Sequence, residues 1–207
     1  MKKILISILF YVSLITCNAQ KKIFYGIRSG YGISNISRSN GAYQTLGAYQ
    51  FGLSSEMKIK GILSLQGEVL FSKIGFKSED PYIASAFPLF AGIPTFYYNE
   101  YYIDVPLQAK IKSSKLTKST KAYYMLGLSP SFLLSSHGST NFDNEKSNNF
   151  RYQHFMNLNL YNTLGLEFDY GRIIPFIDMR YNHGLTSVNK GGNTTNLQLS
   201  FNAGVKF

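Results

Sequence analysis

The sequence predicts an all-β fold: an eight-stranded antiparallel up-and-down transmembrane β-barrel, preceded by a cleavable signal peptide. Three observations predict it. The first 19 residues resemble an export signal, and apolar and polar residues alternate in segments throughout the remainder. The final segment, residues 197–207, has an apolar residue at every odd position and a polar residue or glycine at every even one. A strand of this kind turns one face to lipid and the other to the interior of a barrel.

Residues 1–19 are predicted to be the signal peptide. Lys2 and Lys3 are followed by an apolar-biased run of twelve residues, 4–15, which is too short to span a bilayer as a helix. We place cleavage after Ala19, with Cys17 as the other small residue of the cleavage site. In the competing interpretation Cys17 is the acylated residue of a lipoprotein, although Thr16 before it fits that site poorly. With a single cysteine, the chain forms no internal disulfide.

The predicted mature domain, residues 20–207, has the composition of an exported barrel. Removing 19 of 207 residues leaves 188, and the loss of Lys2 and Lys3 leaves 19 basic residues against 11 acidic ones, a net charge of +8. We assign this charge to solvated loops and turns, some facing lipid phosphates, and exclude nucleic acid as a partner. The 16 Tyr and 16 Phe, with no Trp, suit aromatic girdles at the membrane surfaces.

Seven segments before the last one also alternate. In order they are residues 25–33, 49–57, 63–71, 102–112, 121–129, 158–169 and 177–182, and the first two are weaker because glycines interrupt them. Together with the terminal segment they make eight strands, an even and small number. Since about ten residues cross the membrane in each strand, 188 residues suffice for eight strands and their connections.

The connections predict which way the barrel faces. Little more than Lys60-Gly61 joins the second and third strands, and residues 169–172 join the sixth and seventh. Longer segments, about residues 77–96 and 136–149, are predicted surface loops, whereas residues 113–120 form a longer turn. Because outer-membrane barrels have short periplasmic turns and longer external loops, both termini are predicted in the periplasm.

Two prolines fall inside predicted strands. Pro106 and Pro175 cannot donate a hydrogen bond to a neighbouring strand, so they are expected near strand ends or bulges.

Several short motifs resemble those of the PorT-like outer-membrane β-barrel family. They are Tyr102-Ile103-Asp104-Val105-Pro106-Leu107, the early Gly26 and Gly30-Tyr31, Leu126-Gly127-Leu128-Ser129-Pro130, Gly165-Leu166-Glu167 and the final Gly204-Val205-Lys206-Phe207. The resemblance covers nearly the whole mature chain and implies an eight-stranded barrel that accommodates Pro106. The member that gives the family its name is associated with a secretion system, whereas most members have no established activity.

Charged residues on the predicted interior face are the candidate site. They are Arg28, Glu68, Asp104, Lys110, Glu167, Asp178 and Arg180. An eight-stranded barrel is just wide enough for its own side chains, and unpaired buried charges are costly. We therefore predict a structural ion-pair network that fills the lumen; the alternative is a proton or ion site.

No catalytic, cofactor or metal site is predicted. His137, His154 and His183 lie too far apart for a metal motif, and Glu167 with Asp169 near a turn is a weak acid/base pair. His137-Gly138-Ser139 has the spacing of the His-x-Ser pair that barrel-embedded lipid A deacylases combine with an acid. We expect it in a Ser/Gly/Asn-rich loop and therefore predict that the protein is not an enzyme.

Two functional classes remain for a protein predicted in the outer membrane. One is a structural or interaction barrel that presents its loops to a partner in the cell envelope. The other is a transport component, either a small pore or a secretion accessory, with a lipid-modifying enzyme as a remote third. The expected partners are outer-membrane lipid and the barrel-assembly machinery, which would read the terminal strand with Phe207 as the assembly signal.

Overall fold

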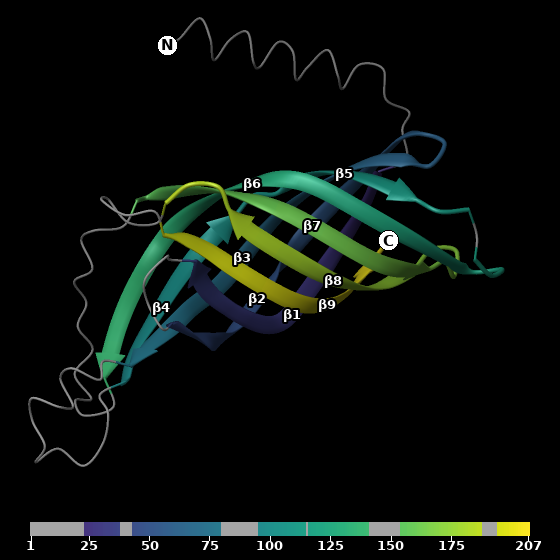
Figure 1. Ribbon diagram of the computed structural model, residues 1–207. Helices are drawn as coiled ribbons and strands as arrows, with labels where there is room; N and C mark the ends of the chain where they lie inside the picture. The colour runs from purple at the N-terminus through teal and green to yellow at the C-terminus, as the bar shows by residue number, and fades with distance from the viewer. Residues whose placement is uncertain (1–22, 38–42, 80–94, 115, 141–153, 188–193) are drawn as a thin grey trace, which may run out of the picture.

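The computed structural model describes residues 23–37, 43–79, 95–114, 116–140, 154–187 and 194–207. The predicted signal peptide and most residues of the two long loops lie outside this part of the chain. The described residues form a closed antiparallel barrel (Figure 1). Its strands are β1 (Ile23–Ser37), β2 (Tyr43–Lys60), β3 (Leu63–Glu79), β4 (Thr95–Asp104), β5 (Leu107–Lys112), β6 (Thr120–Thr140), β7 (Met156–Phe168), β8 (Ile174–Gly184) and β9 (Thr195–Lys206).

These nine segments make a ring of eight strands. The segments β4 and β5 occupy one position in the wall, because both pair with β3 on one side and with β6 on the other. Pairing of β9 with β1 closes the ring. The predicted eight-stranded antiparallel barrel is confirmed. Among the described segments, no helix is long and apolar enough to cross a membrane.

Both prolines lie where the sequence predicts. Pro106 falls in the break between β4 and β5, where the N–H of Val105 donates to the carbonyl of Pro130 at 3.0 Å. The carbonyl of Pro106 accepts a hydrogen bond from the N–H of Glu68, also at 3.0 Å. Pro175 is the second residue of β8. The wall therefore stays hydrogen-bonded beside the residue that cannot donate.

The two faces of each strand differ as predicted. In β9, Phe201 is exposed on the outer face while Ser200 and Asn202 are buried inside. Aromatic rings also pack against one another on the outer face of β2, β3 and β4, where the Phe71 ring lies 6.4 Å from that of Tyr49 and 6.0 Å from that of Tyr101. The described exterior thus carries the apolar and aromatic surface expected against lipid.

The two ends of the barrel have different connections. We call the end with the β2–β3, β5–β6 and β7–β8 connections the turn end, and the opposite end the loop end. The start of β1 and the end of β9 also lie at the turn end, where Figure 1 places the C-terminus. Gly61 and Gly171 have φ of 55° and 87° in two of the turns, a backbone region that favours glycine. The two predicted tight turns are confirmed.

One predicted boundary is wrong. Residues 136–140, expected in the surface loop at 136–149, belong to β6, which continues to Thr140. Its last residues pair with β4, with His137 opposite Asn99 and Thr140 opposite Phe96, beyond a register shift between Tyr101 and Tyr102. Serine and glycine have weak strand propensity, but pairing with the aromatic-rich β4 outweighs it here.

Candidate functional site: the charged lumen

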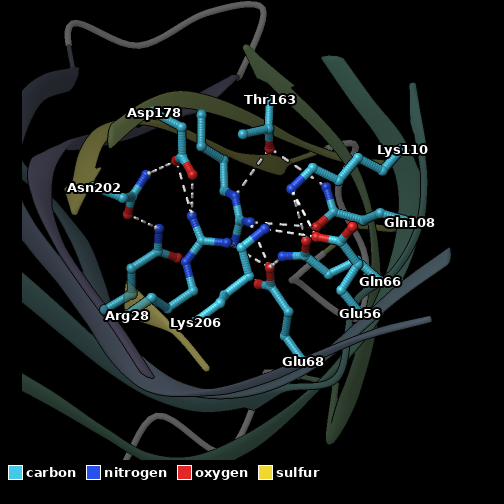
Figure 2. A network of polar contacts seen from close by, with 12 residues as sticks. Arg28, Glu56, Gln66, Glu68, Gln108, Lys110, Thr163, Asp178, Asn202 and Lys206 are labelled. Atoms are coloured by element: carbon cyan, nitrogen blue, oxygen red, sulfur yellow. Dashed lines mark hydrogen bonds and ion pairs between the residues drawn. The ribbon is translucent and has the colours of Figure 1, made fainter. Parts of the chain in front are cut away.

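The structure places all seven predicted charged residues inside the barrel, each at most 5% exposed. They project from the surrounding strands toward the axis, where most of them meet in one network (Figure 2). Two clusters can be distinguished by their ion pairs. We call them the central cluster and the turn-end cluster.

The central cluster contains Arg28, Glu68, Asp178 and Arg180. Arg28 Nη2 donates to Asp178 at 2.7 and 2.8 Å, and Arg28 Nη1 pairs with Glu68. Arg180 contacts both oxygens of Glu68 in a bidentate pair of 2.9 and 3.0 Å. The side chains in these ion pairs are fully buried. Two guanidinium groups therefore balance two carboxylates away from water.

Neutral side chains complete the central cluster. They are Gln66, which donates to Glu68 at 2.6 Å; Tyr123 and Asn202, which donate to Asp178 at 2.7 and 2.8 Å; and Thr163 and Gln108, which accept from Arg180 at 3.1 and 3.2 Å. A buried ion pair is favourable only when its remaining hydrogen-bonding groups are also satisfied. These contacts satisfy most of the remaining hydrogen-bonding groups of the four charged side chains.

The turn-end cluster is an alternating ring of charges. Glu56 on β2 contacts Lys110 on β5 at 3.1 Å and Lys206 on β9 at 2.6 Å. Both lysines also pair with Glu167 on β7. In the order around the barrel these four residues stand on every second strand. The four ion pairs therefore cross the lumen and connect these four strands.

Further contacts pack the turn-end cluster tightly. Lys112 joins it from the end of β5, at 2.6 Å from Glu56 and 2.8 Å from Glu167. The ammonium of Lys110 lies 3.9 Å from the centre of the Tyr123 ring, a distance at which a cation and an aromatic face attract. Three ammonium groups thus surround two carboxylates.

Asp104 stands apart from both clusters. Among the described residues it forms no ion pair, and Ser72 donates a hydrogen bond to its carboxylate at 2.6 Å. It borders a cavity of about 20 Å³ that Tyr102, Ser131 and Tyr161 also line. A space of this size holds about one water molecule. The structure therefore brings six of the seven predicted residues into ion pairs and leaves Asp104 beside a small polar cavity.

The sequence prediction missed two buried members of the turn-end cluster, Glu56 and Lys206. The signal for both was present, because each falls on the even-numbered, polar face of its strand. Glu56 follows Ser54 in β2, and Lys206 follows Asn202 in β9. Extending the two-residue period to the last residues of each strand would have found them.

The His-x-Ser motif lies in a strand, so its expected position in a loop is wrong. His137 and Ser139 belong to β6 and pair with Asn99 and Tyr97 of β4. In nucleophilic catalysis an acid orients the histidine base. In the described part of the chain, the buried Nδ1 of His137 has no hydrogen-bond partner. The residues that the structure describes also contain no group of three or more His, Cys, Asp or Glu side chains that could hold a metal ion.

The closed ring of strands, the apolar and aromatic exterior and the charged interior define the class: a transmembrane β-barrel. The chain belongs to the family described as outer membrane protein beta-barrel domain, whose model matches residues 18–190. The outer membrane is therefore its location.

Comparison with solved structures gives matches of low sequence identity. Neisserial surface protein A (NspA) is 19% identical, with 90% of this chain and 99% of that chain covered and a TM-score of 0.50. Ail of Yersinia pestis, solved with the heparin analogue sucrose octasulfate, is 16% identical over 90% of this chain and 99% of its own, with a TM-score of 0.44. The outer membrane enzyme PagL is 10% identical over 86% and 97%, with a TM-score of 0.45. No curated protein matches significantly. At 19% identity the likeness to NspA concerns the fold alone.

Proposed function

We propose that this protein is a non-conducting outer-membrane barrel that acts through its surface loops, in a structural or interaction role. The observation that carries the proposal is the ion pair between Arg180 on β8 and Glu68 on β3. These strands lie on opposite sides of the eight-stranded ring. Together with the alternating ring of the turn-end cluster, this pair obstructs the lumen at two levels. A barrel closed in this way has its loops as the surface left for recognition.

The conductance of the purified barrel in a planar lipid bilayer tests this function. We expect no steady single-channel current from the wild-type protein, because charged side chains occupy the path of ions. The variant Glu68→Ser/Arg180→Ser replaces both residues of the central pair with shorter side chains. It serves as the comparison protein with a widened lumen. A steady current from the wild type would contradict the proposal and favour the transport alternative.

The orientation is part of the same proposal, with the turn end in the periplasm and the loop end outside. We expect a cysteine at Ser139, near the end of β6, to react with a membrane-impermeant maleimide on intact cells. A cysteine at Ser114, in the β5–β6 turn, should react only after the outer membrane is permeabilised. The mature chain is expected to lack other cysteines, so each label reports one site. The reverse labelling pattern would overturn the orientation.

The resemblance to the PorT-like family supports the alternative role of a secretion accessory. Its most distinctive motif, residues 102–107, spans the break between β4 and β5, with Tyr102 and Asp104 buried inside. Export by a cleaved signal peptide and delivery to the barrel-assembly machinery belong to the same proposal. A secretion accessory with a closed lumen would also act through the ends of the barrel. The conductance test therefore distinguishes it from a pore but not from a structural or interaction barrel.

A further inference from the structure

Basic side chains gather at the turn end of the barrel. Lys58 and Lys60 lie at the end of β2, Lys118 in the β5–β6 turn and Arg172 in the β7–β8 turn, and all four are exposed. We call these four residues the basic rim. Within the described part of the chain, none of the four forms an ion pair with a carboxylate. Their charges are therefore available to an external partner.

The two ends of the barrel differ in charge along the sequence. Segments 58–62, 113–121 and 169–173, which leave out the already paired Lys112, contain six basic residues and one acidic residue, Asp169. That acid lies 3.5 Å from Lys121, so it is already paired. In the connections of the loop end, segments 38–42, 80–94, 141–153 and 185–194 contain four basic residues and three acidic ones. The excess of positive charge is thus a property of the turn end.

Apolar side chains are exposed beside the rim. They are Ile62, Leu116, Tyr170 and Ile173, which lie in the same three turns and are 54–69% exposed. Aromatic and aliphatic groups next to lysine and arginine are typical of the boundary between hydrocarbon and headgroups, where apolar groups enter the bilayer and basic groups reach the phosphates. A soluble acidic partner would use the charges but would not require this apolar border.

We propose that the basic rim binds the headgroups of anionic phospholipids in the leaflet at the turn end. The lipid phosphates supply the negative charge that Asp169 alone does not. Each basic residue near an anionic surface strengthens the binding free energy by about 1 kcal/mol, or roughly fivefold in affinity. The proposal requires only that the barrel is inserted in a membrane. It is independent of the closed lumen and of the orientation.

The lack of tryptophan allows a local test of lipid selectivity. Tyr170→Trp places a reporter at the turn end, and Phe155→Trp places a matched reporter at the loop end, since these residues follow and precede β7 and are 69% and 72% exposed. Each variant is reconstituted in phosphatidylcholine vesicles that contain phosphatidylglycerol, with bromine on the acyl chains of one lipid or the other. Quenching of the tryptophan fluorescence gives the relative binding constant of the two lipids at each end.

We expect phosphatidylglycerol to be preferred about fivefold or more at the turn-end reporter and to show a ratio near one at the loop-end reporter. Arg172→Gln/Lys118→Gln removes two of the four rim charges and should lower the turn-end ratio severalfold, whereas Lys77→Gln on β3 near the loop end should leave it unchanged. A preference that is equal at both ends, or that the double variant leaves unchanged, would overturn the proposal. So would binding of soluble polyglutamate to the rim without any lipid preference, which would assign it to an acidic protein. Absence of quenching by either lipid at both reporters would also overturn it, because the barrel would then not be inserted.

Discussion

We expect Arg180→Ala to lower the free energy of unfolding of the detergent-solubilised barrel by about 3–5 kcal/mol. The Arg180 guanidinium is fully buried and holds both oxygens of Glu68, while it also donates to Thr163 and Gln108. Its removal leaves the central cluster with one cation, Arg28, for two buried carboxylates. Equilibrium unfolding in urea, followed by circular dichroism, measures the loss.

Two variants make this prediction specific. Lys118→Ala, in the exposed β5–β6 turn, should change the free energy of unfolding by less than about 0.5 kcal/mol. Glu68→Gln/Arg180→Gln removes one charge of each sign and leaves Arg28 paired with Asp178, so it should be less destabilising than Arg180→Ala alone. Equal losses for Arg180→Ala and Lys118→Ala would show that the central cluster does not hold the barrel together.

The barrel could be predicted from the sequence because its main rule is local. A strand between lipid and a polar lumen alternates every two residues, so parity alone places Arg28 and Arg180 inside and Phe201 outside. The positions of the prolines could be predicted in the same way, because a residue without an N–H is expected at a break or near a strand end. Neither argument requires knowledge of distant contacts.

The ion-pair partners could not be predicted, because they depend on how the strands are staggered around the ring. Parity places Asp104 and Glu68 on the same interior face, yet Glu68 meets both arginines and Asp104 lies beside a serine hydroxyl and a small cavity. The continuation of β6 through His137 is a similar case. Its composition indicates a loop, and only the pairing with β4 makes it a strand.

Deletion of Phe207 is expected to reduce the assembled barrel severalfold while synthesis of the chain continues. Phe207 makes the last exchange of backbone hydrogen bonds across the β1–β9 closure, with its N–H and carbonyl at 2.8 and 3.0 Å from Tyr25. Its ring is 61% exposed on the outer face, where the assembly machinery would meet it. The measurement is the fraction of the protein that is extracted from the membrane and is heat-modifiable, compared between variants that are synthesised in equal amounts.

Phe201→Ala is the matched control, because it removes an exposed ring from the same outer face of β9 and leaves the closing hydrogen bonds in place. Phe207→Tyr retains both the ring and the backbone pair. If position 207 acts as a terminal signal, only the deletion should reduce assembly strongly, and Phe207→Tyr should assemble like the wild type. An equal loss with Phe201→Ala would attribute the effect to aromatic area against lipid. Normal assembly of the deletion variant would show that closure of β9 onto β1 through Lys206 suffices.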